Sequence, residues 1–302
     1  MRLLPKVIAA LLGAGVLVLS GVVGWGHIQI RRVAPPLPTV AELLAIRADE
    51  GGPVSVRFVN TSSQALPAGT LGHTVVLVEW ANGDLFMIDA GMDRETAVEF
   101  GRLIEVALGG QEVEAHGSIA ELVGDDVDRV VGVAFTHLHS DHTQGIVPFC
   151  EARGAGARLY QTPWQADLHN HTTRGGAALM DDSCLEPGET VAGSDGLLRI
   201  PGHPGFAMLG LGGHTPGSTL FAIAGRDRLW LLSGDIANVK ADLLANRGKG
   251  FVYSTFIVPE DTARTEALRL WLRELDARDD MSVIVSHDVD AARVSGMAEY
   301  ER

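Results

Sequence analysis

Apolar residues along the chain fall into short runs separated by turn-forming and polar positions. Such runs, rich in valine, isoleucine and leucine, are typical of strands, especially of strands buried on both faces. They predict strands over residues 54–59, 74–80, 85–89, 130–135, 206–211, 219–224, 229–233 and 282–286. The turn Ala81-Asn-Gly-Asp84 predicts that the second and third of these strands form a hairpin.

Helix-start signals lie between these strands. Each signal is a capping residue followed by an amphipathic run or by a glutamate or glutamine three positions later. The signals predict helices that begin after Asp93, Ser118 and Thr162, and a long amphipathic helix within residues 259–276. Because strands and helices mix in both halves of the chain, the pattern favours a layered α/β or α+β fold.

The N-terminal residues show a different pattern. No charged residue occurs from Val7 to Ile30, and a helix of this length would rise about 36 Å, enough to cross a hydrocarbon core of about 30 Å. We therefore expect residues 1–32 to be a single-pass membrane anchor, residues 33–53 a linker, and residues 54–302 one folded domain on the extracytoplasmic side. The alternative is a signal segment that is cleaved to give a secreted or periplasmic protein.

Composition adds limits on core size and on partners. Hydrophobic residues make up 46% of the chain, which is enough for a sizeable core. The net charge is -14, whereas a protein that binds nucleic acid should carry a basic surface, so nucleic acid is excluded as a partner. Cys150 and Cys184 are the only cysteines, and they could pair in an exported domain or remain two buried thiols. The sequence predicts no particular oligomeric state.

Three histidines and an aspartate crowd together directly after the predicted strand 130–135. Side chains alternate in an extended segment, so His137 and His139 point to the same side and can bind one ion. Asp141 and His142 come where the chain turns into the next helix, which directs them towards a second ion. Imidazole nitrogens and a carboxylate, with no cysteine close by, favour zinc, with iron(II) or manganese as alternatives.

Three more candidate ligands follow predicted strands in the second half of the chain. His214 lies in the turn Gly212-Gly-His-Thr-Pro-Gly-Ser218, Asp235 ends the run Leu231-Leu-Ser-Gly-Asp235, and His287 ends the run Val283-Ile-Val-Ser-His287. Layered folds build their sites from residues at strand ends. We therefore expect these three residues to meet the first group at one site.

The series H-x-H-x-D-H, G-H-T-P-G-S, S-G-D and S-H-D resembles the metallo-β-lactamase-fold hydrolase superfamily. The segment Phe86-Met-Ile-Asp89-Ala-Gly91 resembles the early D-x-G element of that superfamily, and the motifs occur in order over residues 54–290. Several motifs in register are far more specific than any one of them. The pattern is most similar to the lactonase and glyoxalase II-like members.

The resemblance implies an α+β fold, a four-layer αββα sandwich, with two divalent metal ions between its sheets. The implied ligands are His137, His139 and His214 for the first ion, Asp141, His142 and His287 for the second, and Asp235 as a bridge. Asp89 would orient the ligand loop. The implied enzyme is a hydrolase in which a hydroxide shared by the ions attacks an ester-like bond of a small molecule, such as a lactone, ester or thioester, while Asp141 relays the proton to the leaving group.

Departures from the better-known branches leave the substrate open. Asp235 counts against a true β-lactamase, which usually lacks this aspartate, and Thr143-Gln-Gly145 departs from the D-H-x-G-G motif of hydroxyacylglutathione hydrolases. Asn238 stands where the lactonases tend to carry a tyrosine, which Tyr253 could replace if its loop folds over the site. The alternatives are β-lactamase or phosphodiesterase activity at the same site, and a non-catalytic, membrane-tethered interaction protein that binds metal.

Histidines outside these motifs are expected to be structural, because a lone histidine is more often structural than catalytic. His73 precedes a strand and could line the pocket. His169 and His171 fall in the helix predicted after Thr162, His203 falls in a turn, and His27 lies near the end of the predicted anchor.

Overall fold

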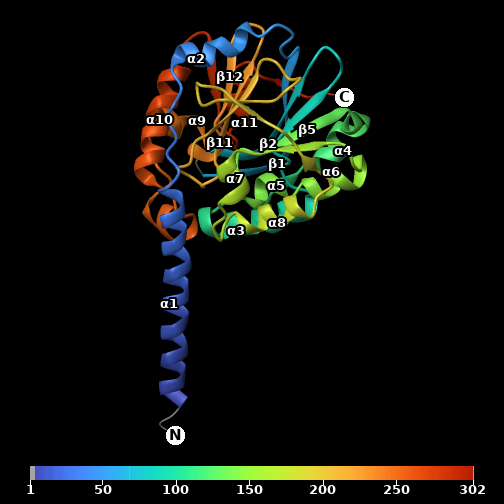
Figure 1. The fold of residues 1–302 in the computed structure, drawn as a ribbon. Helices are drawn as coiled ribbons and strands as arrows, with labels where there is room; N and C mark the ends of the chain where they lie inside the picture. The colour runs from blue at the N-terminus through green and yellow to red at the C-terminus, as the bar shows by residue number, and fades with distance from the viewer. Residues whose placement is uncertain (1–3, 68, 302) are drawn as a thin grey trace.

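The computed structural model describes residues 4–67 and 69–301 (Figure 1). The strands are β1 (Ser55–Leu66), β2 (Gly69–Glu79), β3 (Leu85–Ile88), β4 (Glu114–Ala115), β5 (Val130–Ala134), β6 (Arg158–Tyr160), β7 (Glu186–Pro187), β8 (Val191–Ala192), β9 (Leu198–Arg199), β10 (Phe206–Gly210), β11 (Thr219–Ala224), β12 (Leu229–Leu232), β13 (Met281–Ile284) and β14 (Ala298–Glu299).

The helices are α1 (Leu4–Ile30), α2 (Val40–Ala45), α3 (Arg94–Leu108), α4 (Ile119–Val123), α5 (Ser140–Thr143), α6 (Ile146–Arg153), α7 (Pro163–Asp167), α8 (Arg174–Asp181), α9 (Lys240–Leu244), α10 (Thr262–Asp276) and α11 (Val289–Val294). Shorter helical turns are η1 (Ile46–Ala48), η2 (Gly124–Arg129), η3 (Gly234–Ile236) and η4 (Tyr253–Ile257).

These strands form two mixed sheets. The first has the order β14-β1-β2-β3-β5-β6-β7, with β4 also paired to β1, and the second has the order β13-β12-β11-β10-β9-β8. β3, β5, β6 and β7 are mutually parallel, and so are β12 and β13. The carboxyl ends of parallel neighbours lie at the same edge of a sheet, which is where such folds build their sites.

The buried residues show four layers. Phe86 of the first sheet and Phe221 of the second belong to one core between the sheets. Met87 points to the other face and packs under α4 and α6, while Leu231 packs under α10. Because both faces of these central strands are covered, the strands are continuous apolar runs without alternation. The predicted α+β, four-layer αββα sandwich is confirmed.

The predicted strands are all present. β1 and β2 extend beyond the predictions, because they pair with each other through polar residues that carry no apolar signal. The side chains of Asp93, Ser118 and Thr162 cap α3, α4 and α7 as predicted, and α10 lies within the predicted range. The hairpin turn closes where the amide of Trp80 donates to the carbonyl of Asp84.

The helix after Thr162 is shorter than predicted. α7 ends at Asp167, and Leu168 has an extended backbone (φ −116°, ψ 103°). The prediction that His169 and His171 lie in a helix is therefore wrong, because both belong to the connection between α7 and α8.

Residues 33–53, which were expected to be a linker, pack on the domain. Thr39 and Glu42 form a capping box that starts α2, and Leu43 and Ile46 are buried in the core under the second sheet. A helix of six residues is too short to give a clear periodic signal, so the sequence pattern did not predict it. The folded part of the chain therefore begins before residue 54.

α1 projects from the domain (Figure 1). Within it, Gly13–Ile30 is the one segment among the described residues that is long and apolar enough to cross a membrane or to act as a signal. The C-terminal end of the helix packs on the domain, where Ile30 and Val33 are fully buried.

The two cysteines are paired. Cys150 of α6 and Cys184, which follows α8, form a disulfide. The structure thus selects one of the two alternatives left open by the sequence.

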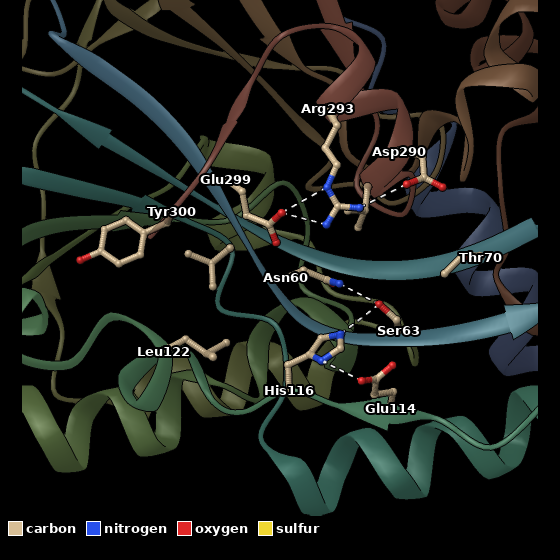
Figure 2. Close-up of a pocket in the computed structure, with 12 residues that line it drawn as sticks. Asn60, Ser63, Thr70, Glu114, His116, Leu122, Asp290, Arg293, Glu299 and Tyr300 are labelled. Carbon is tan, nitrogen blue, oxygen red and sulfur yellow. Dashed lines mark hydrogen bonds and ion pairs between the residues drawn. The ribbon is translucent and has the colours of Figure 1, made fainter. Parts of the chain in front are cut away.

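A cavity of about 500 Å³ lies beside β1, β14 and α11 (Figure 2). Its polar side chains are bonded to one another: Arg293 pairs with Asp290 and Glu299, and His116 Nε2 lies 3.1 Å from Ser63 Oγ. None of the predicted metal ligands lines this cavity.

Candidate metal centre

The loop after β5 is held in place by Asp89. β3 and β5 are parallel neighbours, so the residues that follow these two strands lie side by side. Asp89 has a left-handed backbone (φ 61°), and its carboxylate accepts hydrogen bonds from the amide (2.7 Å) and the hydroxyl (2.8 Å) of Thr136. These bonds fix the start of the segment that carries His137 to His142.

The other candidate ligands reach the same edge from the second sheet. Because β12 and β13 are parallel, Asp235 and His287 are neighbours, with His287 Nε2 3.1 Å from Asp235 Oδ1. His214 comes from the loop between β10 and β11, and its Nε2 lies 3.8 Å from Asp235 Oδ2. The two carboxylate oxygens of Asp235 therefore face different histidines.

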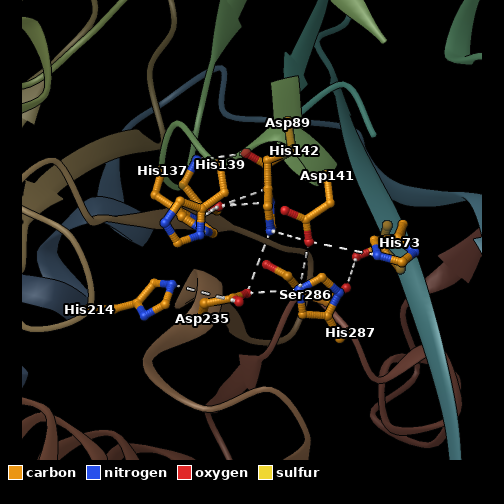
Figure 3. A network of polar contacts seen from close by, with 12 residues as sticks. His73, Asp89, His137, His139, Asp141, His142, His214, Asp235, Ser286 and His287 are labelled. Carbon is orange, nitrogen blue, oxygen red and sulfur yellow. Dashed lines mark hydrogen bonds and ion pairs between the residues drawn. The ribbon is translucent and has the colours of Figure 1, made fainter. Parts of the chain in front are cut away.

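The structure brings all of the predicted ligands together (Figure 3). Three groups have potential ligand atoms within 4.8 Å of one another: His137 with His139 and His214, His137 with His142 and Asp235, and Asp141 with His287 and His73. Asp141 Oδ2 lies 3.5 Å from His287 Nε2 and 3.7 Å from His142 Nε2. The predicted first and second sets are each contiguous, and Asp235 lies between them.

Hydrogen bonds on the outer side of three imidazoles direct their free nitrogens inward. Nδ1 of His142 donates to Asp89 Oδ2 (2.9 Å), Nδ1 of His214 to Glu260 Oε1 (2.6 Å), and Nδ1 of His287 to the carbonyl of Gly72 (2.8 Å). A carboxylate or carbonyl behind a histidine is the usual support of a metal-binding imidazole. When such a ring is neutral, this hydrogen bond leaves Nε2 with a lone pair that points into the centre.

Several polar atoms that face the centre make no hydrogen bond within the described part of the chain. Among the described residues, the buried Nε2 atoms of His73, His142 and His214 and the Oδ1 atom of Asp235 make no hydrogen bond. Buried polar atoms are rarely left in this state unless a ligand completes them. Imidazole nitrogens and carboxylate oxygens of this kind fit divalent metal ions.

The charges in the centre also suit cations. Burial and the neighbouring imidazoles lower the pKa of His137 and of His139, so both rings are neutral and able to bind metal. Burial acts against the charged form of Asp235, but His287 and Lys249 hold its pKa well below the usual value. Burial also acts against the charged form of His142, yet Asp89 and Asp141 raise the pKa of that imidazole well above the usual value.

Some residues of the centre were missed by the sequence analysis. His73, which was expected to be structural, is buried with its Nε2 3.7 Å from Asp141 Oδ2. Lys249 Nζ lies 3.3 Å from Asp235 Oδ2, and Glu260 supports His214. Lys249 Nζ also lies 5.4 Å from the ring centre of Tyr253, so the segment that carries Tyr253 does fold towards the site. These residues belong to no motif, and only the tertiary fold brings them here.

The remaining histidines of the sequence analysis lie outside the three groups of ligand atoms. His203 packs edge-on against Trp80, with ring centres 4.8 Å apart. His169 Nε2 bonds the carbonyl of Gln165 (2.8 Å), and His27 Nε2 bonds the carbonyl of Thr255 (3.0 Å).

The sequence profile of the metallo-beta-lactamase superfamily matches residues 68–287. The chain therefore belongs to this superfamily and is a metal-dependent hydrolase. No match was found among the curated proteins.

Solved structures share the fold. An N-acyl homoserine lactone hydrolase, solved with the product N-hexanoyl-L-homoserine at its catalytic metal centre, aligns with a TM-score of 0.57 and 16% identity over 80% of this chain and 96% of its own. A quorum-quenching N-acyl homoserine lactone lactonase aligns with a TM-score of 0.58 and 17% identity over 83% of this chain and 99% of its own. A probable metal-dependent hydrolase from Staphylococcus aureus aligns with a TM-score of 0.53 and 16% identity over 79% of this chain and 91% of its own.

Proposed function

We propose that the protein is a dinuclear metal hydrolase that cleaves an ester-like bond, such as a lactone, ester or thioester, in a small molecule. The observation that carries this proposal is the position of Asp235. One of its oxygens faces His287 and the other faces His214, so a single carboxylate adjoins both sets of candidate ligands.

The seven candidate ligands divide into two sets. His137, His139 and His214 would hold the first ion, and Asp141, His142 and His287 would hold the second, with Asp235 placed to contact both. Zinc suits these ligands best, with iron(II) or manganese as alternatives. When bound, two such ions acidify a water molecule and polarise a carbonyl oxygen of the substrate.

Asp141 also handles the proton. Burial acts against its charged form, but His142 and His287 lower its pKa, so the carboxylate is ionised at neutral pH. A carboxylate beside the attacking water can accept a proton and pass it to the leaving group.

Tyr253 takes the place of the tyrosine that is absent at Asn238. Burial raises the pKa of Tyr253, so its hydroxyl keeps its proton and can donate a hydrogen bond to a carbonyl oxygen of the substrate. The shared fold with lactone-cleaving enzymes makes lactones the first substrates to test.

α1 is proposed to anchor the chain in a membrane, with the folded domain on the extracytoplasmic side. The disulfide between Cys150 and Cys184 supports this side, because disulfides persist in oxidising compartments. Cleavage of α1 as a signal is the alternative, and the N-terminal sequence of the mature protein distinguishes the two.

The test combines metal content with turnover. The purified full chain should contain close to two metal equivalents and hydrolyse at least one substrate in a panel of lactones, thioesters, aryl esters, phosphodiesters and β-lactams. His142→Ala should lower both metal content and turnover, whereas the control His203→Ala should keep the metal content. A chain that takes up no metal when zinc is supplied would contradict the proposal. If the chain hydrolysed only β-lactams or only phosphodiesters, the proposed substrate class of lactones, esters and thioesters would be wrong.

A further inference from the structure

The end of α1 is fixed against two loops of the domain. A Cβ atom at Gly26 would lie 2.8 Å from Pro259 Cγ and 3.8 Å from Asn170 Cβ, so the helix packs closely there. His27 Nε2 bonds the carbonyl of Thr255 in η4 (3.0 Å). The helix therefore leaves the domain at a defined place, beside the 168–173 loop and η4.

The part of α1 that projects beyond this contact is short. Residues 13–22 are exposed, and residues 7–22, which carry no charge, rise about 24 Å as a helix, less than the hydrocarbon core of about 30 Å. A helix of this length can span a bilayer only if the end of the domain lies directly at the membrane surface. Trp25, which is half exposed, stands at this level, as tryptophan commonly does at membrane interfaces.

A group of exposed apolar side chains lies at the same level. We define the membrane-facing surface as Phe251, Val252, Phe256 and Ile257, which are 75%, 64%, 57% and 56% exposed. They flank Thr255, the residue that bonds His27 of α1. So many large apolar side chains within one short segment mark an interaction surface. Their place beside the end of α1 identifies the partner as the lipid surface that α1 enters.

The other side of the same segment touches the metal centre. Lys249 Nζ lies 3.3 Å from Asp235 Oδ2, and Ser254 Oγ donates to Glu260, which in turn bonds His214. The 168–173 loop also contacts both α1 and the metal centre. Asn170 packs near α1, and Thr172 Oγ1 lies 3.0 Å from His139 Nε2. Two of the loops that border the metal centre are therefore loops on which α1 docks.

We propose that the membrane-facing surface rests in the lipid interface and that the metal centre takes its substrate from the bilayer. The substrate is then an amphiphile, an ester or lactone with an acyl chain that partitions into the membrane. The lipid contact rests on the proposed anchor, and the substrate class rests in addition on the proposed function.

Lipid contact can be tested without any turnover. The full chain is reconstituted in phosphatidylcholine vesicles as Phe256→Cys or Val294→Cys, each labelled with an environment-sensitive fluorophore; both native cysteines are in the disulfide. Val294 is 88% exposed on α11 and is the matched control. Spin-labelled lipids should quench the fluorophore at position 256 and not at position 294. Equal quenching, or none at position 256, would overturn the lipid contact.

The substrate class needs a second measurement. The ratio of two rates is compared, one for a vesicle-embedded long-chain lactone and one for a water-soluble aryl acetate. The double variant Phe251→Ser, Phe256→Ser should lower this ratio about tenfold, because the loop then buries less apolar surface in the lipid interface. Val191→Ser with Val294→Ser is the control. An unchanged ratio would overturn uptake from the bilayer. If the native chain cleaves neither compound, the proposed function fails together with the substrate class, while the fluorescence experiment still decides the lipid contact.

A separate observation concerns His73. Its Nε2 is buried without a partner among the described residues and lies 3.7 Å from Asp141 Oδ2, while Nδ1 is 3.0 Å from Ser62 Oγ. Hydrogen bonds in both directions between Gly72 and His287 connect this part of β2 to the candidate ligand that follows β13. The geometry points to His73 as an additional ligand of the ion held by Asp141 and His287.

This assignment is tested by the spectrum of the bound metal. Cobalt(II) is substituted into the full chain, and its visible absorption reports the number and type of ligands. His73→Ala should change the spectrum and weaken binding of one of two ions about 10–100-fold, and His203→Ala should do neither. The milder His73→Gln variant serves if the alanine variant does not fold. An unchanged spectrum with unchanged affinity for both ions would overturn the assignment.

Discussion

His142 Nδ1 donates a hydrogen bond of 2.9 Å to Asp89 Oδ2, although the two residues lie 53 positions apart in the sequence. The same carboxylate accepts two bonds from Thr136. Asp89 therefore fixes both the backbone of the ligand loop and the tautomer of one of its histidines.

Asp89→Asn should weaken metal binding while the fold is retained. The amide keeps the shape of the side chain but removes the charge that orients and polarises His142, an effect of about 10–100-fold on affinity. Competition with a chromophoric chelator measures this change. The exposed Asp128→Asn serves as the control, and equal affinity in both variants would contradict the role of Asp89.

Glu260→Gln should act on the other set of ligands. Glu260 accepts a bond of 2.6 Å from His214, so its loss should lower the affinity of the first ion more than that of the second. Stepwise titration of the metal, monitored by calorimetry, measures the affinity of each of the two sites. Glu266→Gln, on the exposed face of α10, should leave both affinities as they are in the native chain.

Acid should release the metal, starting near neutral pH. Burial lowers the pKa of His142 and of His287, but nearby carboxylates raise it. The net pKa shift is upward for both residues in the metal-free chain. Protons therefore compete for these nitrogens at a higher pH than for a free imidazole. Apparent affinity should fall about tenfold per pH unit for each proton that must be displaced. Dialysis at stepped pH with elemental analysis measures the release, and metal content that does not change down to pH 5 would contradict this view.

Loss of the disulfide should destabilise the region of α6 to α8. Cys150 and Cys184 close a loop with a sequence separation of 34, and a crosslink of this kind contributes about 2–4 kcal/mol. Cys150→Ser with Cys184→Ser should lower the free energy of unfolding in urea by that amount. Metal content should remain near that of the native chain, because neither cysteine contacts the candidate ligands.

Much of this architecture is visible in the sequence because local patterns reflect it directly. β5 and β12 are buried on both faces and therefore appear as apolar runs, and the candidate ligands His137, Asp235 and His287 follow strand ends. The capping residues Asp93 and Ser118 act within one turn of helix, so three or four positions suffice to recognise them.

The rest depends on contacts between distant segments. His73 is a single histidine within β2, and only the pairing of β2 and the position of His287 bring it to Asp141. Lys249 and Glu260 lie in a segment without periodicity, and the tertiary fold alone sets their distances to Asp235 and His214. α2 is too short to be stable alone, and the burial of Leu43 against the second sheet contributes to its stability.

The central claim is that two metal ions bind on either side of Asp235. Anomalous X-ray diffraction at the zinc absorption edge, from crystals of the zinc-loaded full chain, tests it most directly. The account predicts two anomalous peaks, one among His137, His139 and His214 and the other among Asp141, His142 and His287, with Asp235 in contact with both. The absence of a peak at either position would contradict the claim.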